Sequence, residues 1–344
     1  MKTLLVATAA ALSLAFAGSA LAAYTPHLSI THTPLTLAGG GSTDLTISFD
    51  QADDATAKVT IYVPQGYTGT LGVSPGTQLG TIDASIIAFA ISPTQPLPLK
   101  GVITADDPAK YATNPCSPGP HEAVWLLRLQ AAGTELAVPG YVDTVTASAE
   151  APLGKFKLQF CLPSPYIPPS AGGAMLGAKL VSATLHISNA FALPSQNGSY
   201  GWTAVTTPYT VGAGTPNAAG TVQARAFVQL PAQLSLKAKV KKKTATLSGA
   251  LRLNLAGLTG VKVSLLSGSS RTKLKAAGST TTRARGAFSF RKTVRKTTYF
   301  RARVTVPTRT ASCTGGVPGI PCASATANGF TAHSAIVKVL PKKR

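Results

Sequence analysis

Acidic residues are scarce in this sequence and are missing from its last third. Only 11 Asp and Glu stand against 32 Lys and Arg, which gives a formal net charge of +21 at pH 7. Residues 231–344 hold 23 of the basic residues and no acidic one, whereas residues 1–230 hold all 11 acids. With so few carboxylates, no pair can be nominated for the acid–base chemistry of a glycosidase. The asymmetry indicates that the two parts of the chain have different roles.

The sequence also lacks the motifs of common catalytic and metal sites. The five histidines form no HxH or HExxH arrangement, and the four cysteines show no CxxC spacing. Residues 72–76 match the G-x-S-x-G pattern, but Pro75 follows Ser74 and has no backbone N–H to donate to an oxyanion. Residues 270–273 match S-x-x-K, but in a Gly/Ser-rich loop pattern rather than a helical one. We therefore expect no catalytic residue, no bound metal and no cofactor.

Three aspartates and two tryptophans favour structural over chemical roles. Asp50, Asp53 and Asp54 lie close together, but they lack the spacing, the central Gly and the closing Glu of an EF-hand. A solvated hairpin loop is the favoured interpretation of these aspartates. Trp125 and Trp202 could stack on sugars if exposed, but both lie in apolar strand patterns, which favours packing in the core.

The only long hydrophobic run lies at the N-terminus. Lys2 precedes an apolar stretch over residues 4–16, and residues 20–22 (Ala-Leu-Ala) match the small-x-small pattern of signal peptidase sites. This stretch is shorter than the roughly 20 residues that a transmembrane helix needs. Residues 1–22 are therefore predicted to be a cleaved signal peptide. The mature chain is expected to have no transmembrane segment and to be secreted or associated with the cell envelope.

All four cysteines follow the predicted cleavage point, where thiols can form stable disulfides. Four cysteines allow three pairings. We favour Cys116 with Cys161 and Cys313 with Cys322, one bridge in each domain. Residues 314–321 (Thr-Gly-Gly-Val-Pro-Gly-Ile-Pro) turn easily and let the shorter loop close.

Composition and alternation predict an all-β protein with two antiparallel β-sandwich domains. The chain contains 32 Gly and 25 Pro, which punctuate short strands and break helices. The charge break divides it into an N-terminal domain over residues 23–230 and a basic C-terminal domain over residues 231–344. One helical turn is expected near residues 106–111. Strands are predicted in the N-terminal domain at residues 44–49, 57–63, 123–129, 155–161, 178–187 and 221–228.

In the C-terminal domain, apolar residues on one parity alternate with cations on the other. Leu236, Ala238 and Val240 alternate with lysines, and residues 300–306 alternate with Arg301 and Arg303 in the same way. This pattern is typical of half-buried strands in an antiparallel sandwich.

Residues 234–306 resemble a bacterial immunoglobulin-like domain. The resemblance rests on Lys-Val-Lys-Lys-Lys-Thr-Ala-Thr-Leu-Ser-Gly at 239–249, Gly-Val-Lys-Val-Ser-Leu at 260–265, Gly-Ala-Phe-Ser-Phe at 286–290 and Tyr-Phe-Arg-Ala-Arg-Val at 299–304. Such modules recur on secreted and surface proteins as spacers or adhesive units. The resemblance therefore implies an immunoglobulin-like sandwich with a structural or binding role.

These observations favour a non-enzymatic protein whose basic domain binds an anionic wall or extracellular polymer. Nucleic acid is a less favoured polyanion, because this domain has no Trp and few aromatic residues on which bases could stack. Two alternatives stay open: a structural or adhesive module whose cations only maintain solubility, and a hydrolase with an unrecognised site in the N-terminal domain. The expected polymer contacts are Lys237, Lys239, Lys241, Lys262, Arg301 and Arg303.

The signal peptide yields a direct prediction. Signal peptidase is expected to cleave after Ala22, so N-terminal sequencing of the exported protein should read Ala-Tyr-Thr from residue 23. A mature protein that still begins at Met1 would contradict this expectation.

Overall fold

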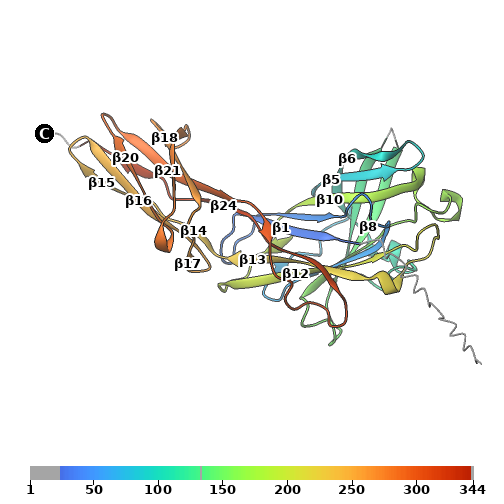
Figure 1. Cartoon of the computed structure of the whole chain (residues 1–344). Helices are drawn as coiled ribbons and strands as arrows, with labels where there is room; N and C mark the ends of the chain where they lie inside the picture. Colours follow the sequence, from blue (N-terminus) through green and yellow to red (C-terminus); the bar gives the residue numbers. More distant parts are fainter. Residues whose placement is uncertain (1–23, 132–133, 342–344) are drawn as a thin grey trace, which may run out of the picture.

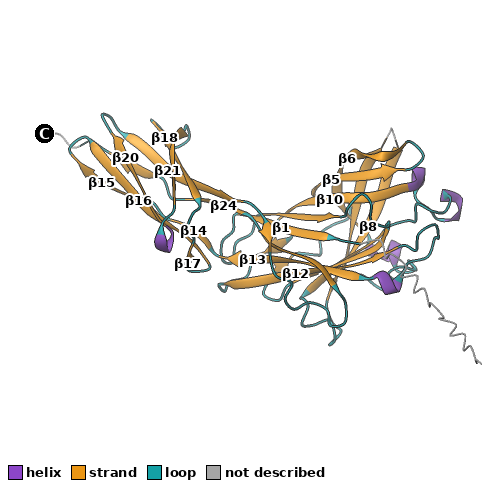
Figure 2. Ribbon diagram, in the orientation of Figure 1, coloured by secondary structure: helices purple, strands orange, loops and turns teal. Residues whose placement is uncertain are grey.

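The computed structural model describes residues 24–131 and 134–341, so the predicted signal peptide lies outside the described residues. Figure 1 shows an elongated molecule with small sheets at one end and one large sheet at the other. Strands dominate both ends, and the helices are short 3-10 turns (Figure 2). The prediction of an all-β protein is confirmed. The 3-10 helices are η1 (Pro108–Tyr111), η2 (Pro169–Ala171), η3 (Met175–Gly177), η4 (Ala218–Gly220) and η5 (Ala284–Gly286).

The predicted helical turn near residues 106–111 is η1. The side chain of Asp107 accepts a hydrogen bond from the Ala109 N–H (3.0 Å), and Pro108 occupies the first helical position. Both residues suit a helix start, because Asp satisfies an orphan N–H and Pro has none to satisfy.

Thirteen strands form the large sheet, and neighbouring strands are antiparallel except for β13 and β23, which are parallel. All six N-terminal strands predicted from alternation are present here, as β2, β3, β7, β9, β10 and β13. In sheet order the strands are β1 (His27–Thr33), β2 (Ser42–Ser48), β10 (Ala178–Ser188), β5 (Gln78–Ala88), β6 (Ser92–Asp106), β7 (Ala123–Ala131), β8 (Thr134–Thr144), β9 (Phe156–Cys161), β3 (Thr56–Val63), β12 (Gly198–Pro208), β13 (Val222–Leu230), β23 (Cys322–Ala327) and β22 (Arg309–Thr310).

The large sheet folds back so that its first strand, β1, lies against β13 and β23. Side chains on and just after β23 bond the free backbone edge of β1. Ser324 Oγ donates to the Pro26 carbonyl (2.5 Å), Thr326 Oγ1 donates to the Leu28 carbonyl (2.6 Å), and Asn328 Oδ1 accepts from the Ile30 N–H (3.1 Å). A bare strand edge invites pairing with other chains, so these contacts protect β1.

The remaining strands form three smaller sheets. A two-stranded sheet pairs β11 (Phe191–Ala192) with β4 (Thr68–Gly69). The first distal sheet contains β14 (Ala232–Leu234), β15 (Lys237–Lys241), β16 (Thr244–Leu253), β17 (Ala256–Gly257) and β20 (Ala287–Thr293). The second distal sheet contains β18 (Lys262–Gly268), β19 (Lys275–Thr281), β21 (Thr298–Val306), β24 (Phe330–His333) and β25 (Val337–Val339).

The chain passes between the large sheet and the distal sheets three times. The connections are Pro231 between β13 and β14, residues 307–308 between β21 and β22, and residues 328–329 between β23 and β24. The last two lie side by side, because the Gly329 N–H donates to Thr308 Oγ1 (2.9 Å). A Cβ on Gly329 would lie 2.7 Å from the Thr308 backbone nitrogen, so this close approach requires glycine. The basic, acid-free part of the sequence begins at residue 231, where the chain first leaves the large sheet. Residues 309–327 belong to the same basic part but return to the large sheet as β22 and β23.

Both expected disulfides are present. Cys116 and Cys161 join the loop after η1 to the end of β9, with 6.2 Å between their Cα atoms. Cys313 and Cys322 close a loop that docks on β13 of the large sheet, not on the distal sheets. There, Gln223 Nε2 donates to the carbonyls of Val317 (3.0 Å) and Ile320 (2.7 Å). The expected pairing is therefore confirmed, but the second bridge stabilises the large sheet.

An aromatic cluster fills the core of the large sheet. Trp125 and Trp202 are fully buried, which confirms their expected role in packing. Trp202 packs edge-on against Tyr67 at 5.3 Å and against Phe191 at 5.8 Å between ring centroids. His32 is buried beside them, with Nε2 3.0 Å from the Tyr67 hydroxyl and Nδ1 3.0 Å from Thr43 Oγ1. Burial lowers the pKa of His32 to about 4.

His32 makes the stability of the fold pH-dependent. The folded state holds the imidazole neutral, whereas the unfolded chain protonates it near pH 6.5. Because the pKa of His32 is lower in the folded state, the unfolded state binds a proton first as the pH falls. The free energy of unfolding therefore keeps its full value above pH 6.5 and decreases by about 3 kcal/mol as the pH falls toward 4. Urea unfolding of His32→Gln should show a markedly shallower loss over this range. The matched variant at exposed His27, His27→Gln, should keep the wild-type slope. Parallel curves for the wild type and His32→Gln would refute this assignment.

Candidate anionic-polymer interface

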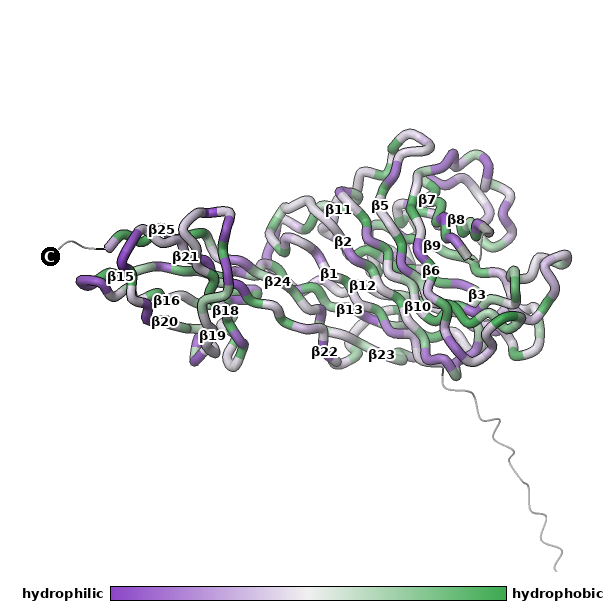
Figure 3. The backbone as a smooth tube through the Cα atoms, turned by 90° about the horizontal axis from the view of Figure 1, so that it is seen from above, coloured by the Kyte–Doolittle hydropathy of each residue, from purple (hydrophilic) through white to green (hydrophobic). Residues whose placement is uncertain are grey.

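A row of lysines lies along β15 in the first distal sheet. Lys237, Lys239 and Lys241 are exposed, whereas Ala238 and Val240 between them are half-buried and pack against the core. Alternate residues of a strand point to the same face and repeat every ~6.6–6.8 Å. The three ammonium groups therefore follow one another along β15, an edge strand that pairs only with β16. Figure 3 shows this strand near the far end of the distal part.

The outer face continues across β16 to β20. Lys239 is paired with Thr246, and Thr246 is paired in turn with Arg291 on β20. The central strand contributes short neutral hydroxyls between the two cations. This spacing leaves each charge exposed and keeps the face free of bulky groups.

Further cations gather where β15 turns into β16. Lys242 and Lys243 form the turn, and the Val294 N–H donates to the Lys243 carbonyl (2.7 Å), which brings exposed Arg295 and Lys296 to the same end. Sequence alternation missed these four residues because they lie in turns, where the period of two does not apply. The run Lys241-Lys242-Lys243 was the available signal.

The other expected residues lie on the second distal sheet. Lys262 is on β18, and Arg301 and Arg303 are on β21, with Arg303 paired between Ser264 and His333. Arg301 is half-buried, and its Nε donates to the Ser334 carbonyl (3.1 Å). The six predicted residues are therefore divided between two sheets, three on each.

His333 reports the positive potential of this second face. Partial burial, followed by the charges of Arg301 and Arg303, lowers the pKa of this histidine. A like charge nearby disfavours protonation. The positive charges of the two arginines thus act on His333, and no nearby carboxylate offsets them.

Within the described residues, every ion pair joins two side chains that lie in the span of residues 44–186. The reason is in the sequence, because its last acidic residue is Glu150. The cations of the distal sheets consequently have only backbone carbonyls, water and counterions as partners.

The catalytic motifs weighed from the sequence occupy turns and loops. Ser74 is exposed in a turn whose Thr77 N–H donates to the Ser74 carbonyl (3.1 Å), and β5 follows instead of a helix. Ser270 lies in the β18–β19 loop, where its Oγ accepts from the Lys273 N–H (3.2 Å). Neither serine is placed as a nucleophile elbow or a helical S-x-x-K motif requires.

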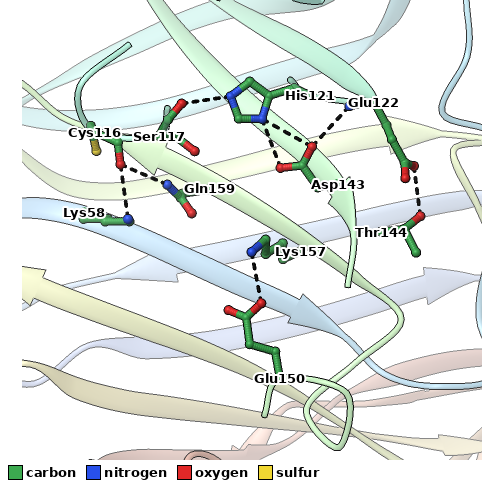
Figure 4. A network of polar contacts seen from close by, with 10 residues as sticks. All are labelled: Lys58, Cys116, Ser117, His121, Glu122, Asp143, Thr144, Glu150, Lys157 and Gln159. Atoms are coloured by element: carbon green, nitrogen blue, oxygen red, sulfur yellow. Dashed lines mark hydrogen bonds and ion pairs between the residues drawn. The ribbon is translucent and has the colours of Figure 1, made fainter. Parts of the chain in front are cut away.

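A His–Asp pair braces the loop around Cys116 (Figure 4). His121 Nδ1 lies 3.0 Å from Asp143 Oδ2, and Nε2 lies 3.0 Å from the Ser117 carbonyl. The imidazole stacks on Tyr141 with 4.5 Å between ring centroids. Both ring nitrogens thus face protein oxygens, which leaves no free nitrogen for a substrate and indicates a structural role.

The aspartate group lies in the turn between β2 and β3. The expectation of a solvated hairpin loop is wrong, because these two strands are not paired with each other and Asp53 is buried. The Asp53 carboxylate accepts hydrogen bonds from the backbone N–H groups of Thr25 (2.9 Å) and Asp50 (3.2 Å). It thereby closes a tight turn and ties the N-terminal segment to it. Among the described residues, no group of three or more His, Cys, Asp or Glu side chains is arranged to hold a metal ion.

No protein-family model matches the sequence, and no curated protein matches it. Across residues 24–131 and 134–341, no helix has the length and apolar character needed to cross a bilayer.

The lysine row is expected to lower the stability of the protein slightly. Lys237→Gln/Lys239→Gln/Lys241→Gln should raise the free energy of unfolding at low ionic strength by less than about 1 kcal/mol, because the like charges repel each other. The gain should vanish at 1 M NaCl, where screening acts within about 3 Å. The control Lys100→Gln/Lys110→Gln removes cations 3.5 Å from Asp83 and 2.7 Å from Asp106, so it should not stabilise the protein. Equal shifts in both variants would contradict the prediction.

Proposed function

We propose that this chain is a non-enzymatic secreted or envelope-associated protein whose basic distal part binds anionic polymers electrostatically. The observation that carries the proposal is the set of outward-facing cations on both distal sheets without any acidic residue after Glu150. Solubility alone could be reached with mixed charges and does not require the complete exclusion of Asp and Glu.

An immunoglobulin-like sandwich is the architecture we propose for the distal part, and a second sandwich for the large sheet. The strand order supports this proposal, because β14, β15, β16 and β20 share one sheet while β18, β19, β21 and β24 share the other. Buried Leu247 and Phe290 on the first sheet, and Val263 and Val304 on the second, alternate with polar neighbours. Such alternation on two facing sheets is characteristic of immunoglobulin-like sandwiches.

Export is supported by the predicted signal peptide together with two disulfides, since disulfides persist in oxidising compartments. Polymers available there include wall polymers and acidic polysaccharides. A nucleic acid is a less favoured polymer, because its bases would need exposed aromatic side chains on which to stack. In the distal part Tyr299 is half-buried and the phenylalanines are buried, namely Phe288, Phe290, Phe300 and Phe330.

The binding mechanism we propose is counterion release. A polyanion laid along β15 or across the turn at Lys242 displaces the small anions that screen these cations, and the gain in entropy drives association. Recognition of this kind depends on charge density and on the ~6.6–6.8 Å repeat along the strand, and not on the identity of the sugar or monomer. Binding should therefore be broad in specificity and steep in its dependence on salt.

The proposal predicts a weaker salt dependence in a defined variant of the full mature chain. A short DNA duplex serves as a polyanion of known charge spacing, and dextran sulfate as an unrelated one. For Lys237→Gln/Lys239→Gln/Lys241→Gln, the slope of log K against log salt on the duplex should become shallower by about 0.9 for each phosphate that the variant no longer neutralises, or roughly 2–3 in total. Adding Arg301→Gln and Arg303→Gln should flatten it further.

The control removes the same charge elsewhere. Lys100→Gln/Lys110→Gln/Lys155→Gln lowers the net charge equally but acts on the N-terminal part. Its slope should match that of the wild type on both polymers. If the two triple variants behave alike, or if the wild type ignores both polymers at low salt, the basic faces do not bind anions and a purely structural module takes the place of this proposal.

A further inference from the structure

One half of the large sheet encloses an apolar cavity of about 590 Å³. The strands that line it are β2, β10, β5, β6, β7, β8, β9 and β3, which are consecutive in the order of the sheet. This stretch of the sheet therefore curls around the cavity until β2 and β3 lie across it from each other. The volume falls within the ~300–1,000 Å³ of small-molecule sites, whereas protein interiors otherwise contain few voids larger than a water molecule.

Aliphatic side chains form the wall. Ile47, Ile86 and Leu129 contribute branched chains from three different strands, and Ala84 and Ala183 contribute only methyl groups. The two alanines face each other in the register of β10 and β5, and their short side chains leave space that longer ones would fill. These aliphatic side chains offer dispersion contacts and no hydrogen bonds, so this part of the wall suits a hydrocarbon body.

Among the described residues, two charged side chains line the cavity, and both have partners in the protein. Glu135 pairs with Arg128 at 3.0 Å. The buried Lys179 ammonium donates to the carbonyls of Gln51 (2.8 Å) and Asp53. The charges of Asp53 and Asp54 also act on this ammonium. An anionic ligand would therefore lose its hydration to approach a cation that already has two acceptors and nearby acidic groups, which is costly.

Most polar side chains in the wall are also bonded within the protein. The Tyr209 hydroxyl donates to the Leu162 carbonyl (2.6 Å), Thr56 Oγ1 lies 2.9 Å from the Tyr24 hydroxyl, and Asn114 Oδ1 accepts from the Cys116 N–H (3.0 Å). The exception is Tyr141, whose hydroxyl is buried without a partner. The cavity thus presents almost no free polar group.

The rim of the cavity is held in place by covalent and hydrogen bonds. The Cys116–Cys161 disulfide lies in the wall. Beyond it, the loop of residues 164–174 is closed by the Ala174 N–H, which donates to the Ser164 carbonyl (2.7 Å). Half-buried Pro165 and exposed Met175 line the cavity there, where it meets solvent. A preformed rim lowers the entropic cost of binding.

We propose that this cavity binds an uncharged small molecule with a hydrocarbon body, at a site separate from the basic faces. The apolar wall selects the body, and the internally paired Glu135 and Lys179 select against an ionic head group. Binding at this site does not depend on the lysines of β15, so it can be tested without reference to polymer binding.

The test uses N-phenyl-1-naphthylamine, an uncharged probe whose fluorescence rises in apolar surroundings. The full mature protein should bind it saturably, and 1-dodecanol should displace it at concentrations at least about tenfold lower than dodecanoate does, a difference of ~1.4 kcal/mol. Ala84→Phe and Ala183→Phe fill the cavity and should each weaken binding of the probe by about tenfold or more. If either fails to fold, Ala84→Leu and Ala183→Leu add less volume and test the same point.

Ala287→Phe is the matched control, since it adds the same side chain at an exposed position of β20. It should bind the probe as the wild type does. Absence of saturable binding, or equal binding by the cavity variants and the control, would overturn the site. Stronger displacement by dodecanoate would overturn the preference for an uncharged ligand.

Discussion

The free backbone edge of β1 is the constraint on which the rest of the structure depends. As the first strand of the thirteen-stranded sheet, β1 has a strand partner on one side only, so the backbone groups on its other side need other hydrogen-bond partners. Three polar side chains, Ser324, Thr326 and Asn328, bond its carbonyl and N–H groups from the side. These residues lie almost three hundred positions away in sequence, so the N-terminal strand is protected only when the C-terminal segment has folded against it.

The large sheet and the distal sheets differ in how their charges are balanced. The acidic residues all lie within the large sheet and its loops, where most of them pair with nearby cations or cap turns. The distal sheets have no acidic residue with which to form such pairs, so their stability rests mainly on alternating apolar residues, backbone ladders and hydrogen bonds of neutral side chains such as Ser235 and Ser334. Burial holds these sheets together, while the unpaired charges remain on the outside.

Alternation predicted many of the strands, because a period of two needs only local sequence, but β1, β6 and β8 were not among the predicted strands. It identified β2, β3, β15 and β21 and the parity on which their cations lie. It could not predict which strands become neighbours, because pairing depends on contacts between distant segments. The return of residues 309–327 to the large sheet therefore could not be read from the charge pattern, which places them with the basic part. Nor could it show that Lys239 and Arg303 belong to different sheets. The cavity was equally invisible, because its wall has the sequence pattern of ordinary buried strands.

The three short connections between the large sheet and the distal sheets have a consequence for how this protein responds to proteolysis. In a protein whose domains are joined by single linkers, one cut in a linker releases a domain. Here a nick at Pro231 alone would leave the distal sheets attached through residues 307–308 and 328–329, and the parallel pairing of β13 with β23 would still join the two sides of the cut. Release of the basic part therefore requires all three connections to be severed, which makes the link between the two parts redundant.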